Sequence, residues 1–280
     1  MKNEFLMAAI QSALDAGKEI LSVYDTDFSV EHKEDQSPLT LADKKAHQVI
    51  TSRLALLQIP ILSEEGRGIA FTERKNWEQL WIVDPLDGTK EFIKRNGEFT
   101  VNIALIERGK PVLGVVYWPV KDILYLGDGK IGAYKIEKAS SLFQTEDAND
   151  PVSILKNTLD QLQRLPLKDS KPGVFTIVGS RSHPSPELEA FVEKMRKEHG
   201  EVDFISAGSA LKICLVAEGA AHIYPRLGPT MEWDTAAGQA VAESSGATVL
   251  DFEKNTPLEY NKENLLNPWF VVKTAVKSEE

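Results

Sequence analysis

The stretch Trp81-Ile82-Val83-Asp84-Pro85-Leu86-Asp87-Gly88-Thr89 carries the most informative pattern in this chain. The apolar run Leu80–Val83 predicts a short buried strand that ends at Asp84, where a carboxylate needs a polar partner or a cation. Pro85 cannot donate a hydrogen bond to a sheet, so the chain turns away and presents the second carboxylate of Asp87. Two carboxylates this close repel each other unless a cation lies between them. The pattern favours a cation site, although an Asp-rich turn with an Asx cap explains the same residues.

Two further carboxylates strengthen the case for a cation. Glu64 follows the short apolar pair Ile61–Leu62, and Asp234 opens a predicted helix directly after Trp233. A carboxylate at a helix start is ordinary, but a bulky aromatic beside it indicates that this helix end is not simply solvated. Oxygen ligands without a Cys/His pattern favour Mg²⁺ or a similar hard cation over zinc. Spacing alone leaves open whether the four carboxylates converge.

Length and composition are those of an ordinary globular protein. The 280 residues suffice for one large or two ordinary domains, and 42% hydrophobic with 26% charged residues exclude wholesale disorder. A net charge of −10 argues against polymeric nucleic acid as a partner, but not against a small phosphorylated ligand. The single cysteine, Cys214, is expected to be a reduced core thiol. No apolar run has the length of a secretory or transmembrane segment, so we expect a soluble, cytoplasmic protein.

The order of predicted elements differs between the two halves of the chain. In the first half, helical periodicity predicts helices over 5–24 and 41–57. The paired apolar runs that follow predict an antiparallel meander, with strands over 80–83, 99–106, 112–118, 123–126 and 131–136. In the second half short strands alternate with helices, with strands over 175–178, 204–205, 221–224 and 248–250 and helices over 186–197, 210–218 and 234–245. This mixture predicts an α+β or layered α/β architecture.

A polar, irregular segment over 141–172 separates the two halves. It is the best candidate for a boundary, although 154–165 could hold a helix. We therefore expect an N-terminal lobe over 1–140 with helices, an antiparallel sheet and most of the cation site. A variable connection over 141–172 would lead to a C-terminal α/β lobe over 173–280 that carries substrate-binding residues.

Two segments resemble the paired signatures of the inositol monophosphatase superfamily, namely 81–89 and Trp233-Asp234-Thr235-Ala236-Ala237-Gly238. The stretches 87–106 and 211–219 are in addition similar to the bacterial CysQ branch of that superfamily. The resemblance covers nearly the whole chain. It implies an α+β fold, a layered αβαβα sandwich of the inositol monophosphatase/sugar phosphatase-like type, and a lithium-sensitive, Mg²⁺-dependent phosphomonoesterase.

By position, the resemblance also implies which residues form the site. The metal ligands would be the carbonyl of Leu86 and the side chains of Glu64, Asp84, Asp87 and Asp234. The catalytic residues would be Asp43, Thr89 and Glu64. Asp43 and Thr89 would align the attacking water, although a first-turn carboxylate favoured by the helix dipole also explains Asp43. Two Mg²⁺ ions, or three, would neutralise the phosphate and activate that water.

The resemblance further implies contacts to a nucleotide bisphosphate. The substrate-binding positions would be Glu64, Leu86, Asp87, Gly88, Thr89, His183, Ser209, Lys212, Arg226 and Asp234. The backbone amides of Gly88 and Thr89 suit a phosphate oxygen by their own chemistry. His183, which follows Arg181 and Ser182, could equally belong to a turn, and Lys212 or Arg226 could be a solvated surface residue.

Members of the CysQ branch are 3′(2′),5′-bisphosphate nucleotidases, which hydrolyse adenosine 3′,5′-bisphosphate to AMP and phosphate. The resemblance therefore implies this reaction, with 3′-phosphoadenylyl sulfate as an additional substrate to test. The resemblance is compatible with a monomer or a homodimer. It is also compatible with peripheral association with the inner membrane, which is possible for relatives.

Three other functions fit parts of the sequence. A haloacid-dehalogenase phosphatase needs Asp-x-Asp-Gly-Thr, whereas Pro85 and Leu86 place two residues between the aspartates here, so Asp84 should not form a phospho-enzyme. Inositol monophosphate or fructose bisphosphate as the substrate is disfavoured, but not excluded, by the stretch 90–101. A non-catalytic metal- or nucleotide-sensing module fits least, because no ligand position looks disabled.

Overall fold

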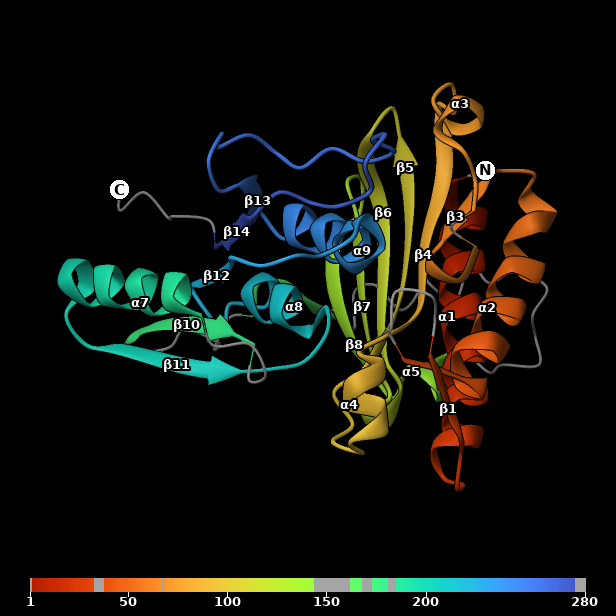
Figure 1. Ribbon diagram of the computed structural model, residues 1–280, viewed down its shortest axis with the longest axis horizontal. Helices are drawn as coiled ribbons and strands as arrows, with labels where there is room; N and C mark the ends of the chain where they lie inside the picture. Colours follow the sequence, from red (N-terminus) through yellow and green to blue (C-terminus); the bar gives the residue numbers. More distant parts are fainter. Residues whose placement is uncertain are drawn as a thin grey trace.

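The computed structural model describes residues 2–32, 38–66, 68–143, 162–167, 173–180 and 185–274. Its elements form alternating layers of helices, sheet, helices, sheet and helix. Figure 1 shows the outer helices at the right, then the large sheet and the middle helices, with the small sheet and the last helix together at the left. The layered αβαβα arrangement implied by the resemblance is therefore confirmed. Over the described residues, no helix is both long and apolar enough to cross a bilayer.

The first helical layer and the large sheet come from the N-terminal half. Helices α1 (Lys2–Tyr24) and α2 (Leu41–Leu54) pack side by side against one face of that sheet (Figure 1). The sheet has seven strands, in the order β3 (Ile61–Ser63), β4 (Gln79–Asp87), β5 (Thr100–Glu107), β6 (Lys110–Trp118), β7 (Ile123–Asp128), β8 (Gly132–Glu137) and β9 (Gln163–Arg164). From β4 to β9 each strand is antiparallel to the next one in the sheet, which confirms the predicted meander, and β3 joins β4 in parallel.

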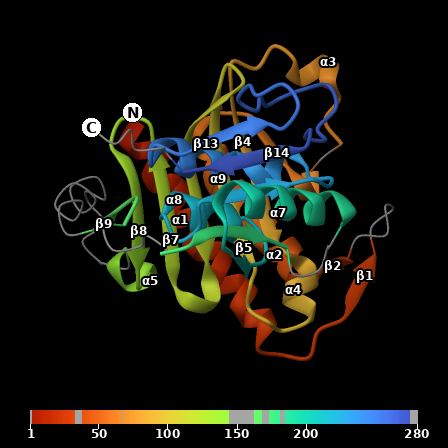
Figure 2. The same cartoon turned by 90° about the vertical axis from the view of Figure 1, so that its left-hand side faces the viewer.

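The C-terminal half supplies the middle helices, the small sheet and the last helix. That sheet has five strands, in the order β11 (Val202–Ser206), β10 (Phe175–Gly179), β12 (Ile223–Arg226), β14 (Phe270–Lys273) and β13 (Thr248–Asp251). Strand β10 is parallel to β11 and β12, whereas β14 is antiparallel to both of its neighbours. Between the sheets lie α8 (Leu211–Ala217) and α9 (Glu232–Ser244), and α7 (Pro186–His199) covers the outer face (Figures 1 and 2).

Short elements complete the fold, and some of them differ from the expectation. They are the ribbon β1 (Val30–His32) and β2 (Pro38–Thr40), the short helices α3 (Phe71–Arg74), α4 (Thr89–Ile93) and α5 (Ala139–Leu142), and the 3₁₀ turns η1 (Ala55–Leu57), η2 (Glu64–Gly66) and η3 (Pro119–Lys121). The predicted helix 41–57 thus ends in a tighter 3₁₀ turn, and the predicted strand 221–224 is shifted to the residues that pair with β14. Most of the helix predicted over 154–165 lies outside the described residues, and its end contains β9.

Apolar side chains fill both faces of β4. Trp81 and Val83 pack into the core under α1 and α2, whereas Leu80 and Ile82 pack into the core shared with α8 and α9. Burial on both faces explains why this strand is continuously apolar in sequence. The second core also contains Cys214, which is buried and free as predicted. This core joins elements from both predicted lobes. Most of the predicted boundary over 141–172 lies outside the described residues, so the boundary stays a prediction.

Helix α9 lies directly against glycines of the large sheet. A Cβ on Gly114 would be 2.3 Å from the carbonyl oxygen of Ala237, and a Cβ on Gly127 would be 2.4 Å from the Cα of Val241. Any larger residue would force the helix away from β6 and β7. This close approach fixes the position of the first turn of α9, which carries Asp234.

Candidate active site

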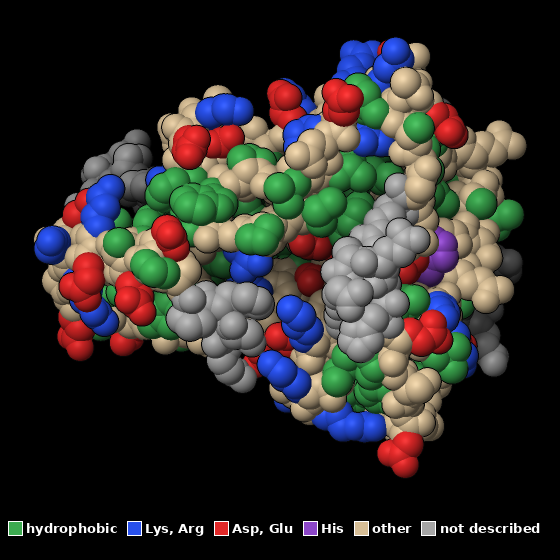
Figure 3. Space-filling model, in the orientation of Figure 1, with side chains coloured by type: hydrophobic (Ala, Val, Ile, Leu, Met, Phe, Trp, Pro, Cys, Tyr) green, Lys and Arg blue, Asp and Glu red, His purple; other side chains and the backbone are tan. Residues whose placement is uncertain are grey.

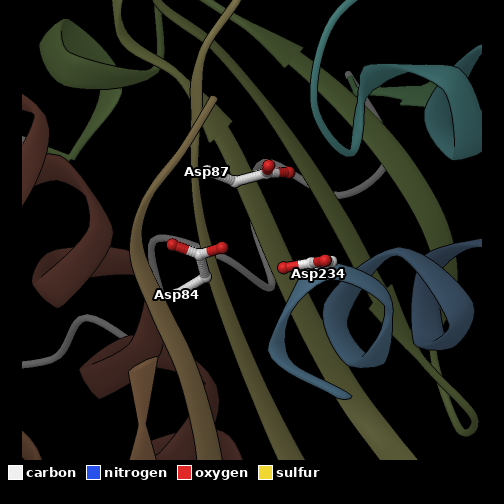
Figure 4. Close-up of side chains that lie close together, drawn as sticks. All are labelled: Asp84, Asp87 and Asp234. Carbon is white, nitrogen blue, oxygen red and sulfur yellow. The ribbon is translucent and has the colours of Figure 1, made fainter. Parts of the chain in front are cut away.

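The two aspartates of β4 flank a bulge. Asp84 pairs with Asn102 of β5 and Asp87 pairs with Thr100, so between these pairs two residues of β4 oppose one residue of β5. Pro85 is one of those two, where the ladder is interrupted and a missing N–H costs no sheet hydrogen bond. The bulge turns both carboxylates toward a common space, as Figure 4 shows.

Asp234 reaches the same space from the first turn of α9. One oxygen from each of Asp84, Asp87 and Asp234 lies within 4.8 Å of the other two (Figure 4). The prediction that Asp234 opens the helix is wrong, because α9 already begins at Glu232, whose N–H donates to the carbonyl of Leu265. The Asp234 carboxylate instead accepts the N–H of the preceding Met231 at 2.9 Å, a capping contact that fixes its orientation.

The three carboxylates form an acidic cluster in which Asp84 is buried and Asp87 and Asp234 are partly exposed. Burial and the Asp87 charge raise the pKa of Asp234 to about 8. Burial raises the pKa of Asp87 to about 6 against the opposing effect of Lys212. Burial and the neighbouring carboxylates raise the pKa of Asp84 well above its usual value. A hard divalent cation relieves this repulsion, and an all-oxygen donor set is the set that such a cation prefers, so the cluster fits a metal.

Glu64 and Leu86, the other predicted metal ligands, lie beside this cluster. The Glu64 carboxylate raises the pKa of Asp84 by its charge and through a side-chain hydrogen bond. Among the described residues, Glu64 is adjacent to, but not part of, the group of oxygens within 4.8 Å. The carbonyl oxygen of Leu86 lies 3.3 Å from the hydroxyl oxygen of Thr89, and the N–H of Leu86 donates to Asp84 at 3.1 Å.

Asp43 and Thr89 meet on the α2 side of the cluster. The Thr89 hydroxyl donates to Oδ1 of Asp43 at 3.2 Å. The other oxygen of Asp43, Oδ2, accepts the N–H and the hydroxyl of Thr40 at 2.7 and 2.6 Å, which completes a capping box on α2. The structural interpretation of Asp43 is therefore confirmed, because its carboxylate caps α2. The same carboxylate also faces Thr89, and its predicted role in aligning water stays a prediction.

Asn102 and Ala210 hold Asp87 and were not expected at the site. Oδ2 of Asp87 accepts the N–H of Ala210 at 2.7 Å and the side-chain amide of Asn102 at 3.2 Å. Asn102 is buried, and its carbonyl oxygen accepts the hydroxyl of Thr100. The sequence offered one signal for Asn102, because it is an amide in an otherwise apolar strand. A buried amide needs specific hydrogen-bond partners, which indicates a polar site nearby.

Lys212 lies in a buried position next to the cluster. Its ammonium donates to the carbonyls of Ser209 at 2.6 Å and Ala207 at 3.3 Å, and burial lowers its pKa to about 8. Ser209 has a positive φ of 46°, and its hydroxyl oxygen lies 3.3 Å from that of Thr100. The surface interpretation of Lys212 is wrong, because the residue is only 6% exposed.

A cleft of about 700 Å³ opens over the cluster, and its lining includes Glu64, Asp87, Gly88, Thr89, Arg226 and Asp234. Figure 3 shows acidic and basic side chains meeting in the hollow between the two halves of the molecule. Arg226 donates from Nη2 to the carbonyl of Pro229, and among the described residues its buried Nε has no partner. The positive φ of Gly88, 93°, places its backbone at the cleft wall.

Part of the predicted substrate site lies outside the described residues. His183, like Arg181 and Ser182, falls in the undescribed stretch 181–184, so its predicted role stays a prediction. The remaining predicted positions converge on the cluster or on the cleft around it.

Glu232 holds a loop against the start of α9. It is fully buried and accepts the N–H groups of Asn261 and Lys262 at 2.6 and 3.0 Å and the Lys262 ammonium at 2.6 Å. Arg74 holds the same loop from the other side through Asn261 and two backbone carbonyls. Glu232 is therefore bound within the fold, away from the three aspartates.

Comparisons with known proteins agree with this geometry. The model of the inositol monophosphatase family matches residues 1–276. A Shigella flexneri protein named 3′(2′),5′-bisphosphate nucleotidase CysQ is 46% identical over 269 residues, which cover 94% of this chain and 96% of the relative. A Haemophilus influenzae protein of the same name is 35% identical over 280 residues, which cover 96% of this chain and 91% of the relative.

Solved structures agree as well. The crystal structure of CysQ from Bacteroides thetaiotaomicron, a bacterial member of the inositol monophosphatase family, matches with a TM-score of 0.87, 49% identity and 97% coverage of both chains. The suhB protein of Bartonella henselae shares the fold, with a TM-score of 0.69 at 22% identity over 95% of this chain and 92% of its own. With a family model spanning nearly its whole length and relatives this similar, the chain belongs to the inositol monophosphatase family.

Proposed function

We propose that the chain is a Mg²⁺-dependent 3′(2′),5′-bisphosphate nucleotidase that hydrolyses adenosine 3′,5′-bisphosphate to AMP and phosphate. One observation carries the proposal: a carboxylate cluster suited to divalent cations shares a pocket with the cationic side chains of Lys212 and Arg226. A monophosphate needs only the first feature, whereas a bisphosphate uses both. The name of the relatives at 46% identity supports the same substrate.

The metal would be held by the acidic cluster. Asp84, Asp87 and Asp234 are the proposed side-chain ligands, with Glu64 and the carbonyl of Leu86 completing the donor set for two Mg²⁺ ions. A third ion would lie toward Asp43. When bound, Mg²⁺ neutralises the phosphate and lowers the pKa of a coordinated water.

Thr89 and Asp43 would orient the attacking water and receive its proton. Because the Thr89 hydroxyl donates to Asp43, the lone pairs of its oxygen face outward to accept a hydrogen bond from water. A proton that leaves the water can therefore pass through the hydroxyl to the Asp43 carboxylate. The contacts from Thr40 keep that carboxylate in place throughout.

The second phosphate would bind on the opposite side of the cluster. Lys212 and the unpartnered Nε of Arg226 supply the charge, and Ser209, Gly88 and His183 complete the proposed contacts. We also propose that the protein is a cytoplasmic monomer or homodimer and that it has no nucleic-acid partner. The net charge of −10 supports the proposal that it does not bind polymeric nucleic acid.

The test is phosphate release with Mg²⁺ from adenosine 3′,5′-bisphosphate, inositol 1-phosphate and fructose 1,6-bisphosphate in parallel. We expect a strong preference for the nucleotide, and 3′-phosphoadenylyl sulfate in a further arm decides whether it is also used. Preference for a sugar phosphate would overturn the nucleotide assignment and keep the metal site. Nucleotide binding without turnover of any compound would favour a sensing module.

Replacing Arg226 with Met should impair binding of the bisphosphate selectively. A hydrogen bond to a charged group contributes about 1.5–3 kcal/mol, so KM for adenosine 3′,5′-bisphosphate should rise by about 10- to 150-fold. The kcat should change much less, and Arg226→Lys should restore part of the affinity. The matched control is Arg108→Met, whose side chain is 82% exposed at the surface. An unchanged KM in Arg226→Met would contradict the role given to this residue.

Stabilisation by Mg²⁺ should increase with pH. Folding raises the pKa of Asp87 to about 6 and that of Asp234 to about 8, so the metal-free folded state binds these protons more tightly than the unfolded chain. The cluster's contribution to stability is therefore lost as pH rises from about 4 to about 8, and Mg²⁺ restores it by replacing the protons. Thermal unfolding with and without Mg²⁺ at matched ionic strength measures this gain. A gain that shrinks with rising pH would contradict the assignment.

A further inference from the structure

A groove lies beside the catalytic cleft, between α7 and the edge strand β11. We call it the side groove and define it by Ser180, Leu188, Val192, Phe204 and Ser206. Its volume is about 540 Å³. Ser180 and Leu188 also line the catalytic cleft, so the groove and the cleft form one continuous depression.

The side groove begins where parallel strands end. Strand β10 ends at Gly179, β11 at Ser206 and β12 at Arg226, and β10 is parallel to the other two. Ligands of open α/β sheets bind outside the carboxyl ends of such strands. Figure 1 shows α7, β10 and β11 together on the half of the molecule that carries these strand ends, and α7 contacts β11.

Phe204 provides an aromatic surface in the side groove. The ring lies against the backbone of β10, because a Cβ on Gly179 would be 2.4 Å from its Cζ atom. Phe204 nevertheless remains 43% exposed. On the opposite wall, Leu188 and Val192 of α7 add apolar surface. A groove with apolar walls and one fixed aromatic ring suits a planar ligand.

The charges around the side groove disfavour a phosphate as its occupant. Glu189, Glu193 and Arg196 line it, and Arg196 forms an ion pair with Glu193. One carboxylate therefore remains without a compensating cation from this lining. An uncharged ring with polar edges fits here better than an anion, and Ser206 adds a hydroxyl to the lining.

We propose that the side groove binds the nucleobase of the substrate, stacked on Phe204, while the phosphates occupy the catalytic cleft. The inference rests on the proposed nucleotide substrate and gives that substrate's base a place. It makes Phe204 a residue that distinguishes nucleotides from inositol phosphates, which lack an aromatic ring. Stacking of a base on an aromatic side chain contributes enough affinity to be measured by substitution.

The experiment compares AMP with ribose 5-phosphate, which lacks the base, by calorimetry with Mg²⁺ present. Wild-type protein should bind AMP about tenfold or more tightly than ribose 5-phosphate. Phe204→Ala should abolish this difference without changing the affinity for ribose 5-phosphate, and Phe204→Tyr should preserve it. Phe252→Ala is the matched control, because this ring is 39% exposed and lies outside the side groove.

An unchanged ratio of the two affinities in Phe204→Ala would overturn the side groove as the base site. Equal affinities of wild-type protein for AMP and ribose 5-phosphate would do the same. Hydrolysis of adenosine 3′,5′-bisphosphate by wild-type protein is measured alongside, so that a failure of the proposed function is seen separately. If wild-type protein hydrolyses adenosine 3′,5′-bisphosphate and Phe204→Ala has the same KM for it, the base site in the side groove is refuted while the proposed function stands.

Discussion

Replacing Asp84 with Asn should abolish metal-dependent turnover, lowering kcat by at least about 1,000-fold at any accessible Mg²⁺ concentration. Asp84 is 1% exposed and lies at the centre of the repulsion between Glu64, Asp87 and Asp234. An amide has the same shape but a weaker oxygen donor and no charge, so the cluster loses affinity for a divalent cation. The fold should persist, because the contact to the N–H of Leu86 can be made by an amide oxygen as well.

The matched control for this substitution is Asp128→Asn. Asp128 is also buried, and it accepts the N–H of Lys130, two residues on, as Asp84 accepts that of Leu86. Initial rates of phosphate release and Mn²⁺ binding, followed by electron paramagnetic resonance, should both fall in Asp84→Asn and stay unchanged in the control. Full turnover by Asp84→Asn despite weakened metal binding would contradict the claim that metal bound at the carboxylate cluster is needed for hydrolysis.

Replacing Thr89 with Val should lower kcat by about 100-fold while KM and the affinity for the metal change little. The Thr89 hydroxyl connects the cleft to Asp43, and Val has nearly the same shape without the hydroxyl. Substitution of Asp43 itself would be less informative, because that carboxylate also caps α2 through Thr40. Thr89→Ser, which keeps the hydroxyl, should recover most of the rate.

Steady-state kinetics at saturating Mg²⁺ measure this split between kcat and KM. A loss confined to KM would indicate that Thr89 only contacts the substrate. Equal rates in Thr89→Val and wild-type protein would remove the hydroxyl from the path of the proton.

Local patterns predicted the parts of the site that depend on local structure. The buried strand follows from its apolar run, but the predicted end at Asp84 is wrong, because β4 continues through the bulge at Pro85 to Asp87. The bulge depends on pairing with β5, and its partner Asn102 could not be selected without that register. Likewise, the helix start at Glu232 depends on a contact with Leu265, a residue more distant in sequence than any capping pattern extends.

The layered fold was implied by family resemblance rather than by periodicity. Strands such as β14 form only because β12 and β13 provide partners on both sides, and their sequence alone is too short to indicate a strand. The buried state of Lys212 likewise comes from packing, since its position in a short helix fits a surface residue equally well. Non-local contacts therefore determine most of what the sequence left open.

The most direct test of the account is anomalous diffraction from crystals grown with Mn²⁺ in place of Mg²⁺. The account predicts strong peaks among the carboxylates of Asp84, Asp87 and Asp234, with Glu64 and the carbonyl of Leu86 in the coordination shell. The same crystals of Asp84→Asn should show weakened peaks. Absence of any peak from the wild-type cluster, in protein that hydrolyses adenosine 3′,5′-bisphosphate with Mn²⁺, would contradict the central claim.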